Sequence, residues 1–386
     1  MDFQPTAEQL NVRDLARRFA VEKIAPRVKR IEEADEFFPD IVRAAGELGF
    51  LGMELPESAG GINSGTIAAT IAAQEFARVN AAVCNILGAI RLHVGLIYRF
   101  GSDAQKSRWL GSITSGTQIG AFAITEPGAG SDVASLATTA IRDGDDYVIN
   151  GQKIFITLAP ACDMMIVLTS TDPSLGSRGQ TCFIVERNNP ELHIGPKEPM
   201  MGQHGIPVSA VYFDNCRVPA SSMLGALGQG FKIMMSGLDG TRLDIAALSL
   251  GLSQAAYEQA ATHAASRQQF GSKIGDFQGV GFMLAEMATE IDAGSFLLYN
   301  AAWLRDAGKP FTKEASMAKY FCADNAMRHT TNAVQIFGGS GYTKAYPMER
   351  LMRDAKICQI YDGTSQIHRV IIARQIMREF MENSAA

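Results

Sequence analysis

The sequence offers little with which to build a disulfide framework or a metal centre. Its six cysteines, among 386 residues, are scattered without a C-x-x-C pair, and its six histidines show no H-E-x-x-H or similar ligand spacing. Isolated cysteines of this kind are typical of small buried side chains in a reducing compartment. We therefore expect neither disulfides nor metal catalysis, and a cytoplasmic protein.

Basic runs and long apolar runs are also missing. The formal net charge is −5 and no run of five or more basic residues occurs, which argues against a nucleic-acid-binding protein. The longest apolar stretches, such as Met164–Leu168 and Ile245–Leu250, are far shorter than the about 18 residues of a membrane span. The first residues lack a basic segment followed by an apolar one, so we expect no signal peptide and no membrane span.

Three segments with different sequence patterns predict three domains. Residues 1–118 are dominated by helical periodicity, which begins with the capping-box spacing of Thr6 and Gln9. Residues 119–230 hold short β-rich runs between turn signals, and residues 231–386 return to long helical repeats. Strands and helices do not alternate, so the pattern predicts an α+β fold and argues against a Rossmann fold.

The middle segment contains the strand predictions. Three runs indicate separate strands: Met165–Thr169, Cys182–Val185 and Val208–Phe213. Two more runs, Tyr147–Ile149 and Ile154–Thr157, flank Asn150-Gly151. Because Asn-Gly is typical of tight β-turns, these two runs are expected to form a hairpin.

Residues 121–132, Ala-Phe-Ala-Ile-Thr-Glu-Pro-Gly-Ala-Gly-Ser-Asp, form the first strong motif. They indicate a strand that runs into a Gly/Pro turn, and such a turn exposes backbone N–H groups and hydroxyls to a polar ring or a phosphate. A short G-x-G-S fragment would indicate only a tight turn. At its full length the motif resembles the signature of the acyl-CoA dehydrogenase family.

Further stretches resemble the same family and follow in its order. They are Arg267–Gly271 with Gln278, Gln335–Tyr342, and the C-terminal pair Arg350–Asp354 and Tyr361–Gln366. Together they extend the resemblance over almost the whole chain. It implies an acyl-CoA dehydrogenase-like fold, with an N-terminal α-helical domain, a central β-barrel-like domain and a C-terminal four-helix bundle, and it implies FAD as the cofactor.

The resemblance also implies which residues contact the cofactor. Phe122, Ile124 and Thr125 would line the flavin, and Phe155 and Thr157 stand where the family places an aromatic residue, usually Trp, and a hydroxyl near N5. Phenylalanine loses the indole N–H but keeps the apolar wall. The other implied contacts, to the flavin edge, the neighbouring subunit's FAD, the pyrophosphate, the adenine and the ribose, are Gly130, Ser131, Arg267, Phe270, Gln278, Gln335, Gly338, Gly339, Thr364 and Gln366.

For the substrate, the resemblance places Asp362 at the position of the catalytic base. The residues implied to contact the acyl-CoA are Ser131, Asp239, Thr241, Arg242, Arg91, Tyr361 and Gly363. The carboxylate would remove the α-proton while the β-hydride passes to flavin N5, and the Asp362 backbone N–H with a ribityl hydroxyl would hold the thioester oxygen. Burial would raise the pKa of such a carboxyl, which suits a base near neutral pH.

Asp362 departs from the family pattern, which reads Tyr-Glu-Gly-Thr where this chain has Tyr-Asp-Gly-Thr at 361–364. Aspartate is shorter by one C–C bond, about 1.5 Å, and a misplacement of about 1 Å can cost roughly 100-fold in rate. Some relatives carry the base on the helix after the β domain, but this chain has Thr241 there, and threonine is no base.

Three interpretations of this departure stay open. Asp362 acts as the base on a substrate that sits closer to it, as the aspartate of nitroalkane oxidase does in the wider superfamily. Alternatively, the base for a remote carbon lies elsewhere, as in an atypical elimination or decarboxylation, or the site is degenerate. The first interpretation leaves space beside the α-carbon for a branched or alicyclic acyl group.

Arg91 is a second departure, because the matching helix of the family borders the acyl pocket and commonly carries small polar residues there. Two interpretations of Arg91 stay open. It contacts a carboxylate-bearing acyl group, as glutaryl-CoA relatives do from another position of that helix, or it lies at the surface or pairs within the protein.

Rival functions and partners complete the expectations. A flavin oxidase or monooxygenase would pass electrons to O₂ rather than to an electron-transfer flavoprotein or a quinone carrier, and a carrier-protein thioester could replace acyl-CoA. A non-enzymatic flavin scaffold is disfavoured because a carboxylate remains at the critical position. The contact through Arg267–Phe270 implies a homo-oligomer, and the family resemblance suggests a tetramer.

Overall fold

The computed structural model describes residues 4–384. The first part of the chain is helical, with α1 (Ala7–Phe19), α2 (Val28–Ala34), α3 (Pro39–Glu47), α4 (Gly65–Val79), α5 (Ala81–Phe100) and α6 (Asp103–Thr114). The predicted capping box is present. The Thr6 hydroxyl accepts the Gln9 N–H at 3.2 Å, and the Gln9 side chain accepts the Thr6 N–H at 2.9 Å.

The middle part of the chain forms one sheet of eight strands. They are β1 (Gly120–Ala123), β2 (Thr139–Asp143), β3 (Asp146–Thr157), β4 (Met164–Ser170), β5 (Gln180–Glu186), β6 (Leu192–Lys197), β7 (Val208–Pro219) and β8 (Met223–Leu224). Hydrogen bonding follows the order β6-β7-β3-β2-β4-β5-β8, and β1 joins β4 in parallel. The three runs predicted as separate strands lie in β4, β5 and β7. β4 is buried along its whole length, which explains its almost continuous apolar sequence.

The predicted hairpin around Asn150-Gly151 is wrong. β3 continues through this dipeptide and pairs with β7 on both sides of it, with a shift of register at Asn150, so both predicted runs belong to one strand. The hairpin forms instead between β2 and β3, across a turn in which Gly144 has a φ of +63°. Gly151 serves close packing, because a Cβ there would come within 2.4 Å of the Thr138 hydroxyl.

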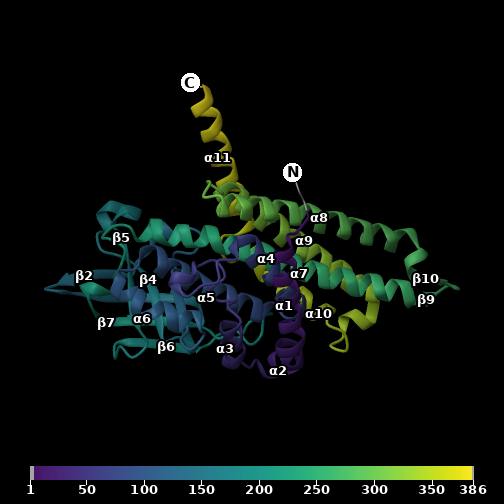
Figure 1. Ribbon diagram of the computed structural model, residues 1–386, viewed down its shortest axis with the longest axis horizontal. Helices are drawn as coiled ribbons and strands as arrows, with labels where there is room; N and C mark the ends of the chain where they lie inside the picture. The colour runs from purple at the N-terminus through teal and green to yellow at the C-terminus, as the bar shows by residue number, and fades with distance from the viewer. Residues whose placement is uncertain (1–3, 385–386) are drawn as a thin grey trace.

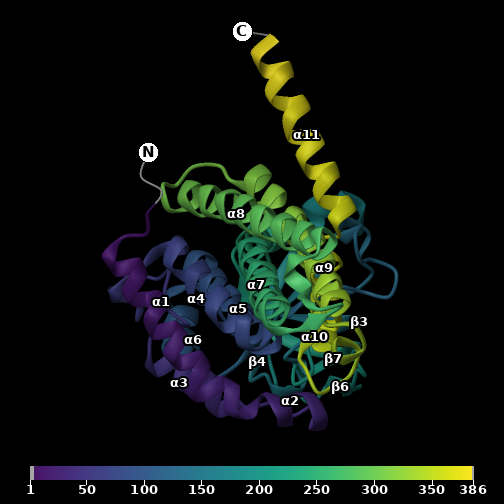
Figure 2. The same ribbon diagram turned by 90° about the vertical axis from the view of Figure 1, so that its right-hand side faces the viewer.

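The rest of the chain is helical again. Its elements are α7 (Gly230–Ser266), the short hairpin β9 (Gln268–Gln269) and β10 (Ser272–Lys273), α8 (Gln278–Asp306), α9 (Thr312–Phe337), α10 (Met348–Lys356) and α11 (Ser365–Ser384). The β9–β10 hairpin lies at the opposite end of the molecule from the large sheet, and α11 projects away from the other helices (Figures 1 and 2). The order helices, sheet, helices confirms the predicted fold class.

α5 belongs to the core. Among residues 4–384 it is the one helix long and apolar enough to cross a membrane by length and composition, but 72% of the relevant window is buried inside the protein. It packs against α4, α6 and α7, so its apolar surface is covered by other helices. Its Cys84, like the other five cysteines, is buried and free of disulfides, as predicted.

A buried ion pair joins the segment after β1 to the middle of the sheet. Lys153 of β3 is completely buried, and its Nζ donates to Glu126 Oε1 at 2.7 Å and to the Ile124 carbonyl at 3.0 Å. Glu126 also accepts the backbone N–H groups of Ala137 at 2.6 Å and Thr138 at 3.0 Å. Burial alone would raise the pKa of Glu126, but Lys153 and these donors hold it below its ordinary value. The carboxylate therefore ties the turn after β1 to the sheet.

Lys153→Met should test this anchor, because it leaves the Glu126 carboxylate buried without its counter-charge. Breaking a buried pair costs on the order of 3 kcal/mol, so the thermal-unfolding midpoint should fall by several degrees. The double variant Lys153→Met/Glu126→Gln should recover part of the loss, since a neutral amide still accepts an N–H. Equal midpoints for the wild type and Lys153→Met, followed by circular dichroism, would contradict the anchoring role.

Candidate functional site

Residues 361–364 connect α10 to α11 and are here called the catalytic turn, after the base predicted at Asp362. Asp362 and Gly363 both have left-handed backbone, with φ of +53° and +96°. Glycine adopts this conformation freely, and aspartate tolerates it better than most residues. A Cβ at Gly363 would also approach His368 Nε2 to 3.1 Å. Thr364 then accepts a backbone N–H of the first turn of α11 at 3.2 Å, so the sequence Asp-Gly-Thr both forms the turn and starts the helix.

The Asp362 carboxyl is half-buried beside two long helices. Thr241 on α7 donates its hydroxyl to the Leu238 carbonyl at 3.1 Å and also faces this carboxyl. Burial raises the pKa of Asp362 above its ordinary value, and Thr241, Lys319 and Arg242 offset only part of the rise. A carboxyl with a raised pKa next to fixed donors has the character of a general base.

Lys319 on α9 lies next to the predicted base, and no motif in the sequence points to it. Its side chain is completely buried, and its Nζ donates to the Tyr361 carbonyl at 2.8 Å and to the Gly363 carbonyl at 2.6 Å. Burial lowers the pKa of Lys319 to about 8. The one signal in the sequence is a lysine within the run Ala315–Ala323, which is otherwise largely small and apolar, because lysine is almost never fully buried without a partner.

The residues predicted to bind CoA, Asp239 and Arg242, lie next to the catalytic turn and pair with each other. Asp239 also accepts the Thr312 hydroxyl at 2.7 Å. Arg242 is only 5% exposed, and its Nε has no partner among the described residues. Burial lowers the pKa of Arg242, and Asp239 and Asp362 act in the opposite direction. The CoA contact itself stays a prediction.

Arg91 pairs within the protein, which is one of the alternatives left open for it. Its guanidinium forms an ion pair with Asp244 of α7, and its Nη1 donates to the Ala69 carbonyl at 3.4 Å. Burial raises the pKa of Asp244 to about 6 despite this pair. Asp244 follows Thr241 by three residues, so the two side chains share a face of α7 about one helical turn, or about 5 Å, apart. In the described part of the chain, Arg91 Nε has no partner.

Phe155 presents an aromatic ring on the sheet surface. It is 60% exposed and has a φ of +57°, at a β-bulge in the pairing of β3 with β7. Bulges commonly re-aim a side chain at a functional site. The neighbouring Ile154 N–H donates to the Thr125 carbonyl at 2.8 Å. This bond brings Phe155 and Thr157 beside Thr125 and the end of β1, where Phe122 is partly buried. Five predicted flavin residues, with Ile124 in the core, therefore gather around the end of β1 and the bulge of β3: Phe122, Ile124, Thr125, Phe155 and Thr157.

The turn after β1 leaves open space. Gly130 and Ser131 are exposed, and a Cβ on Gly130 would meet no atom within 4 Å. Glu126 and Ala129 close the turn with two backbone hydrogen bonds of 3.1 Å. Because Glu126 is itself paired with the buried Lys153, the sheet holds this exposed backbone in place. The turn is therefore able to receive a polar ring or a phosphate.

The other predicted cofactor residues lie far from the sheet. Arg267 and Phe270 belong to the β9–β10 hairpin and Gln278 begins α8, at the opposite end of the molecule (Figure 1). Phe270 is 96% exposed and has a φ of +53°. The structure thus does not bring this group and the sheet group together within one chain.

The glycine turn after α9 lies near the end of α7 that leads into the hairpin. Phe337, at the C-terminus of α9, stacks on His263 of α7 with ring centroids 4.1 Å apart. Gln335, Gly338 and Gly339 around it are exposed, and Cβ atoms on the two glycines would meet no atom within 4 Å. At the start of α11, Thr364 is partly buried and Gln366 is exposed. These exposed positions leave room for a ligand at the surface.

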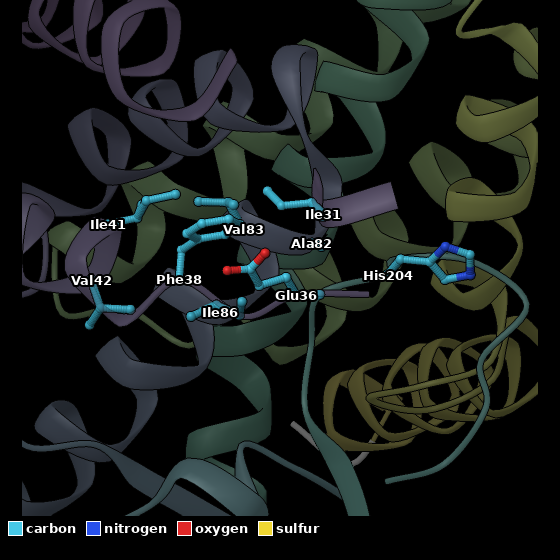
Figure 3. A pocket seen from close by; sticks show the side chains of 10 residues that line it. Ile31, Glu36, Phe38, Ile41, Val42, Ala82, Val83, Ile86 and His204 are labelled. Atoms are coloured by element: carbon cyan, nitrogen blue, oxygen red, sulfur yellow. The ribbon is translucent and has the colours of Figure 1, made fainter. Parts of the chain in front are cut away.

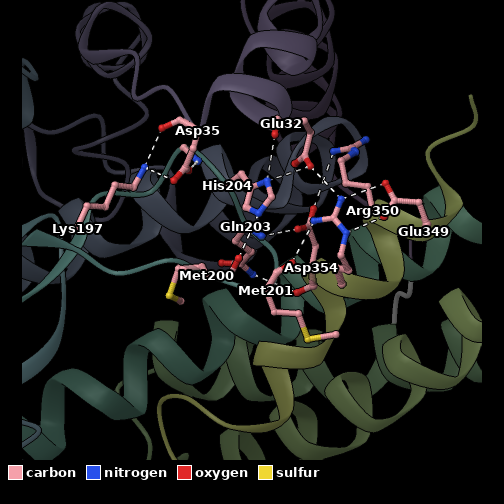
Figure 4. Close-up of polar contacts among 12 residues, drawn as sticks. Glu32, Asp35, Lys197, Met200, Met201, Gln203, His204, Glu349, Arg350 and Asp354 are labelled. Atoms are coloured by element: carbon pink, nitrogen blue, oxygen red, sulfur yellow. Dashed lines mark hydrogen bonds and ion pairs between the residues drawn. The ribbon is translucent and has the colours of Figure 1, made fainter. Parts of the chain in front are cut away.

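A polar network lies at the junction of the three parts of the chain (Figure 4), and its Gln203 links it to the catalytic turn. Asp354 of α10 is completely buried and accepts the Gln203 backbone N–H, while Arg353 donates to Glu32 of α2 at 3.0 Å. The Gln203 side chain in turn faces the Tyr361 hydroxyl, whose pKa is raised by burial. The network therefore contacts the side chain of Tyr361, whereas Lys319 contacts its backbone carbonyl.

A small apolar cavity next to this network is no rival site (Figure 3). It lies among α2, α3 and α5, with Glu36 and His204 as its polar lining residues, and it has room for about one water molecule. None of the predicted site residues lines it. Among residues 4–384, no group of His, Cys, Asp and Glu side chains could hold a metal ion.

Comparison with known proteins agrees with this arrangement. Models of the acyl-CoA dehydrogenase N-terminal, middle and C-terminal domains match residues 6–117, 121–216 and 228–377. The chain is 43% identical over 374 residues to an acyl-CoA dehydrogenase of Bacillus subtilis, covering 96% of this chain and 98% of that one. It is 39% identical over 370 residues to subunit CarC of the caffeyl-CoA reductase–Etf complex of Acetobacterium woodii, covering 95% and 98%.

A solved structure resembles this chain over its whole length. Butyryl-CoA dehydrogenase from Megasphaera elsdenii superposes with a TM-score of 0.95 at 40% identity, covering 98% of this chain and 100% of that one. The likeness in sequence and in structure extends over all three parts of the chain. This protein belongs to the acyl-CoA dehydrogenase family.

Proposed function

We propose that Asp362 is the catalytic base of this protein, which as a member of the acyl-CoA dehydrogenase family is an FAD-dependent enzyme acting on an acyl-CoA. One observation carries the proposal: the Asp362 carboxyl is half-buried, has a raised pKa and faces Thr241, and Lys319 holds the carbonyls of the residues before and after it. In this environment the carboxylate is a stronger proton acceptor than an exposed aspartate, and it takes the α-proton of the thioester.

The backbone of the catalytic turn serves the same reaction. Within residues 4–384 the Asp362 N–H is bonded to no acceptor, so it is free to donate to a ligand. As the α-proton leaves, negative charge develops on the thioester oxygen, and a fixed N–H donor at that oxygen stabilises the charge. The base and the oxyanion donor thus belong to one residue.

The part of the sheet around the end of β1 and the bulge of β3 fits a flavin. Phe155 offers an exposed apolar ring, Thr125 and Thr157 offer hydroxyls beside it, and the turn at Gly130 leaves open backbone. When bound, FAD supplies the acceptor for the β-hydride. The protein's own part is to cover the ring with Phe155 and to keep water from the reacting carbons.

The remote group of cofactor residues supports a homo-oligomer. Phe270 is 96% exposed at the end of the molecule far from the sheet, and along α8 Phe282 is 63% and Trp303 is 50% exposed. Exposed aromatic side chains in such numbers are characteristic of protein interfaces. A second copy, in a dimer or in the tetramer that the family resemblance suggests, would bring its Arg267–Phe270 segment to the cofactor of the first.

An electron-transfer flavoprotein is the proposed electron acceptor. The support is the relative from Acetobacterium woodii, which is named as a subunit of a reductase–Etf complex. A cytoplasmic location belongs to the same proposal, because all six cysteines are buried and free and so fit a reducing compartment.

The acyl group is proposed to be α-branched or alicyclic. Asp362 is one C–C bond, about 1.5 Å, shorter than glutamate, so its carboxylate reaches less far from the catalytic turn. A ring or a branch at the α-carbon fills the space that the missing methylene leaves and brings the α-proton closer to the carboxylate.

Asp362→Asn keeps the shape of the side chain and removes the proton acceptor. The rate of anaerobic flavin reduction by an acyl-CoA should fall by about 10²- to 10⁴-fold, while FAD stays bound. In the wild type this rate should fall as the pH drops through the raised pKa of Asp362, because only the deprotonated carboxylate accepts the proton. Undiminished reduction in Asp362→Asn contradicts the proposal, and substrate-dependent O₂ consumption by the wild type would identify an oxidase instead.

Asp362→Glu tests the acyl group, because it restores the longer side chain at an unchanged backbone position. With cyclohexanecarbonyl-CoA and butyryl-CoA as a matched pair, the wild type should prefer the ring. The variant should shift the ratio of the two kcat/KM values toward butyryl-CoA by roughly tenfold or more. A wild-type preference for butyryl-CoA rejects the alicyclic proposal and leaves the role of Asp362 intact.

Arg91 is proposed to border the acyl pocket, where the Asp244 carboxylate balances the charge of its guanidinium. An acidic acyl group would compete with the Asp244 carboxylate for the same guanidinium. Asp244→Asn should therefore lower the KM for glutaryl-CoA roughly tenfold relative to butyryl-CoA, since a charge-assisted hydrogen bond is worth about 1.5–3 kcal/mol. Adding Arg91→Ala should abolish the gain. An unchanged ratio of KM values would show that neither side chain faces the acyl group.

A further inference from the structure

We propose that Lys319 is a positioning residue for Asp362: its ammonium group ties together the two carbonyls that flank the base and so holds the left-handed turn from which the carboxylate is presented. This inference rests on the proposed role of Asp362 and names the part of the fold that makes the role possible. Lys319 does not itself contact the reacting carbons.

The contacts of Lys319 are those of a clamp. Its Nζ lies 2.8 Å from the Tyr361 carbonyl oxygen and 2.6 Å from the Gly363 carbonyl oxygen, on either side of Asp362. The side chain is completely buried, yet within the described chain it forms no ion pair with a carboxylate. Burying a cation is costly unless it is hydrogen-bonded, so the two carbonyls are what allow a lysine to lie here.

The clamp acts on a backbone that would not otherwise persist. Asp362 has a φ of +53°, a conformation that non-glycine residues keep only where the surroundings over-determine it. Two short bonds from one rigid helix to the residues before and after Asp362 over-determine this turn. The direction of the Asp362 side chain follows from the turn, because its backbone fixes where the Cβ points.

The charge of Lys319 acts in addition to its geometry. Burial raises the pKa of Asp362, and Lys319 lowers it. The other charged or titratable groups that act on Lys319 or are acted on by it are Asp362, Cys358, Arg242, Asp324 and His368. Removing the cation should raise the pKa of Asp362 further, so that the base is protonated over a wider range of pH.

Lys319→Met keeps the length of the apolar stem and removes the ammonium group. In FAD-loaded enzyme, the rate of anaerobic flavin reduction should fall roughly 100-fold, the loss that about 1 Å of misplacement causes, while KM changes much less. The acid limb of the pH–rate profile should move to higher pH. Lys319→Gln still donates to one carbonyl, so its rate of flavin reduction should lie between those of the wild type and Lys319→Met. It takes the place of Lys319→Met if that variant does not load FAD.

Lys313→Met is the matched control. Lys313 lies on the same helix six residues earlier. It pairs with Glu379 of α11 at 2.6 Å and forms no hydrogen bond to the catalytic turn among the described residues. Its loss should leave both the rate and the pH profile unchanged. Wild-type rates and an unshifted acid limb in FAD-loaded Lys319→Met, or in Lys319→Gln, overturn the inference even if the protein is less stable to heat.

The result for Asp362→Asn separates the two proposals. If Asp362→Asn loses flavin reduction and Lys319→Met does not, the base stands and the clamp is rejected. If Asp362→Asn reduces flavin at the wild-type rate, the proposed function itself fails, whatever Lys319→Met shows.

Discussion

The left-handed turn at Asp362 is the constraint on which the rest of the site depends. Each surrounding element contributes one contact to it: α9 provides the Lys319 clamp, α7 provides Thr241, and α11 places His368 directly under Gly363. Burial lowers the pKa of His368 to about 3, so this ring packs as a neutral group and adds no charge next to Asp362. The packing of these helices thus fixes the direction in which the Asp362 carboxylate points.

The sheet repeats the same physical device. Lys153, like Lys319, is a completely buried lysine whose ammonium group donates to a backbone carbonyl, here that of Ile124. Lys153 differs in having a carboxylate partner, Glu126, which carries the anchor on into the open turn at Gly130. A buried ammonium group suits both the turn at Asp362 and the turn after β1, because it is a compact donor of three hydrogen bonds. It can therefore join segments that are not paired as neighbouring strands.

Sequence reasoning succeeded where a motif is local and failed where geometry depends on distant partners. The capping box at Thr6 and the strands β4, β5 and β7 follow from short patterns, and the structure agrees with them. The hairpin at Asn150-Gly151 was predicted wrongly because Asn-Gly favours a turn, whereas here the long pairing of β3 with β7 and the approach of Thr138 decide the conformation. The left-handed bulge at Phe155 depends on that same register, which no local pattern encodes.

Lys319 was missed for a related reason. Its partners are backbone carbonyls, which every residue possesses, so no pairing of side-chain types marks the contact in the sequence. What the sequence does show is a lysine in a run whose neighbours are largely small and apolar, and such a lysine is either snorkelling or held by something buried. Only the fold, which packs α9 against the catalytic turn, decides between these alternatives.

The clamp also bears on the proposed exchange of the family's glutamate for Asp362. Because the backbone at 362 is held by its neighbours' carbonyls and not by its own side chain, shortening that side chain does not release the turn. The carboxylate is drawn back toward the backbone, and the groups that act on it, Thr241 and Lys319, stay in place. We infer that the exchange changes the reach of the base more than its orientation, so any compensation falls to the shape of the acyl group.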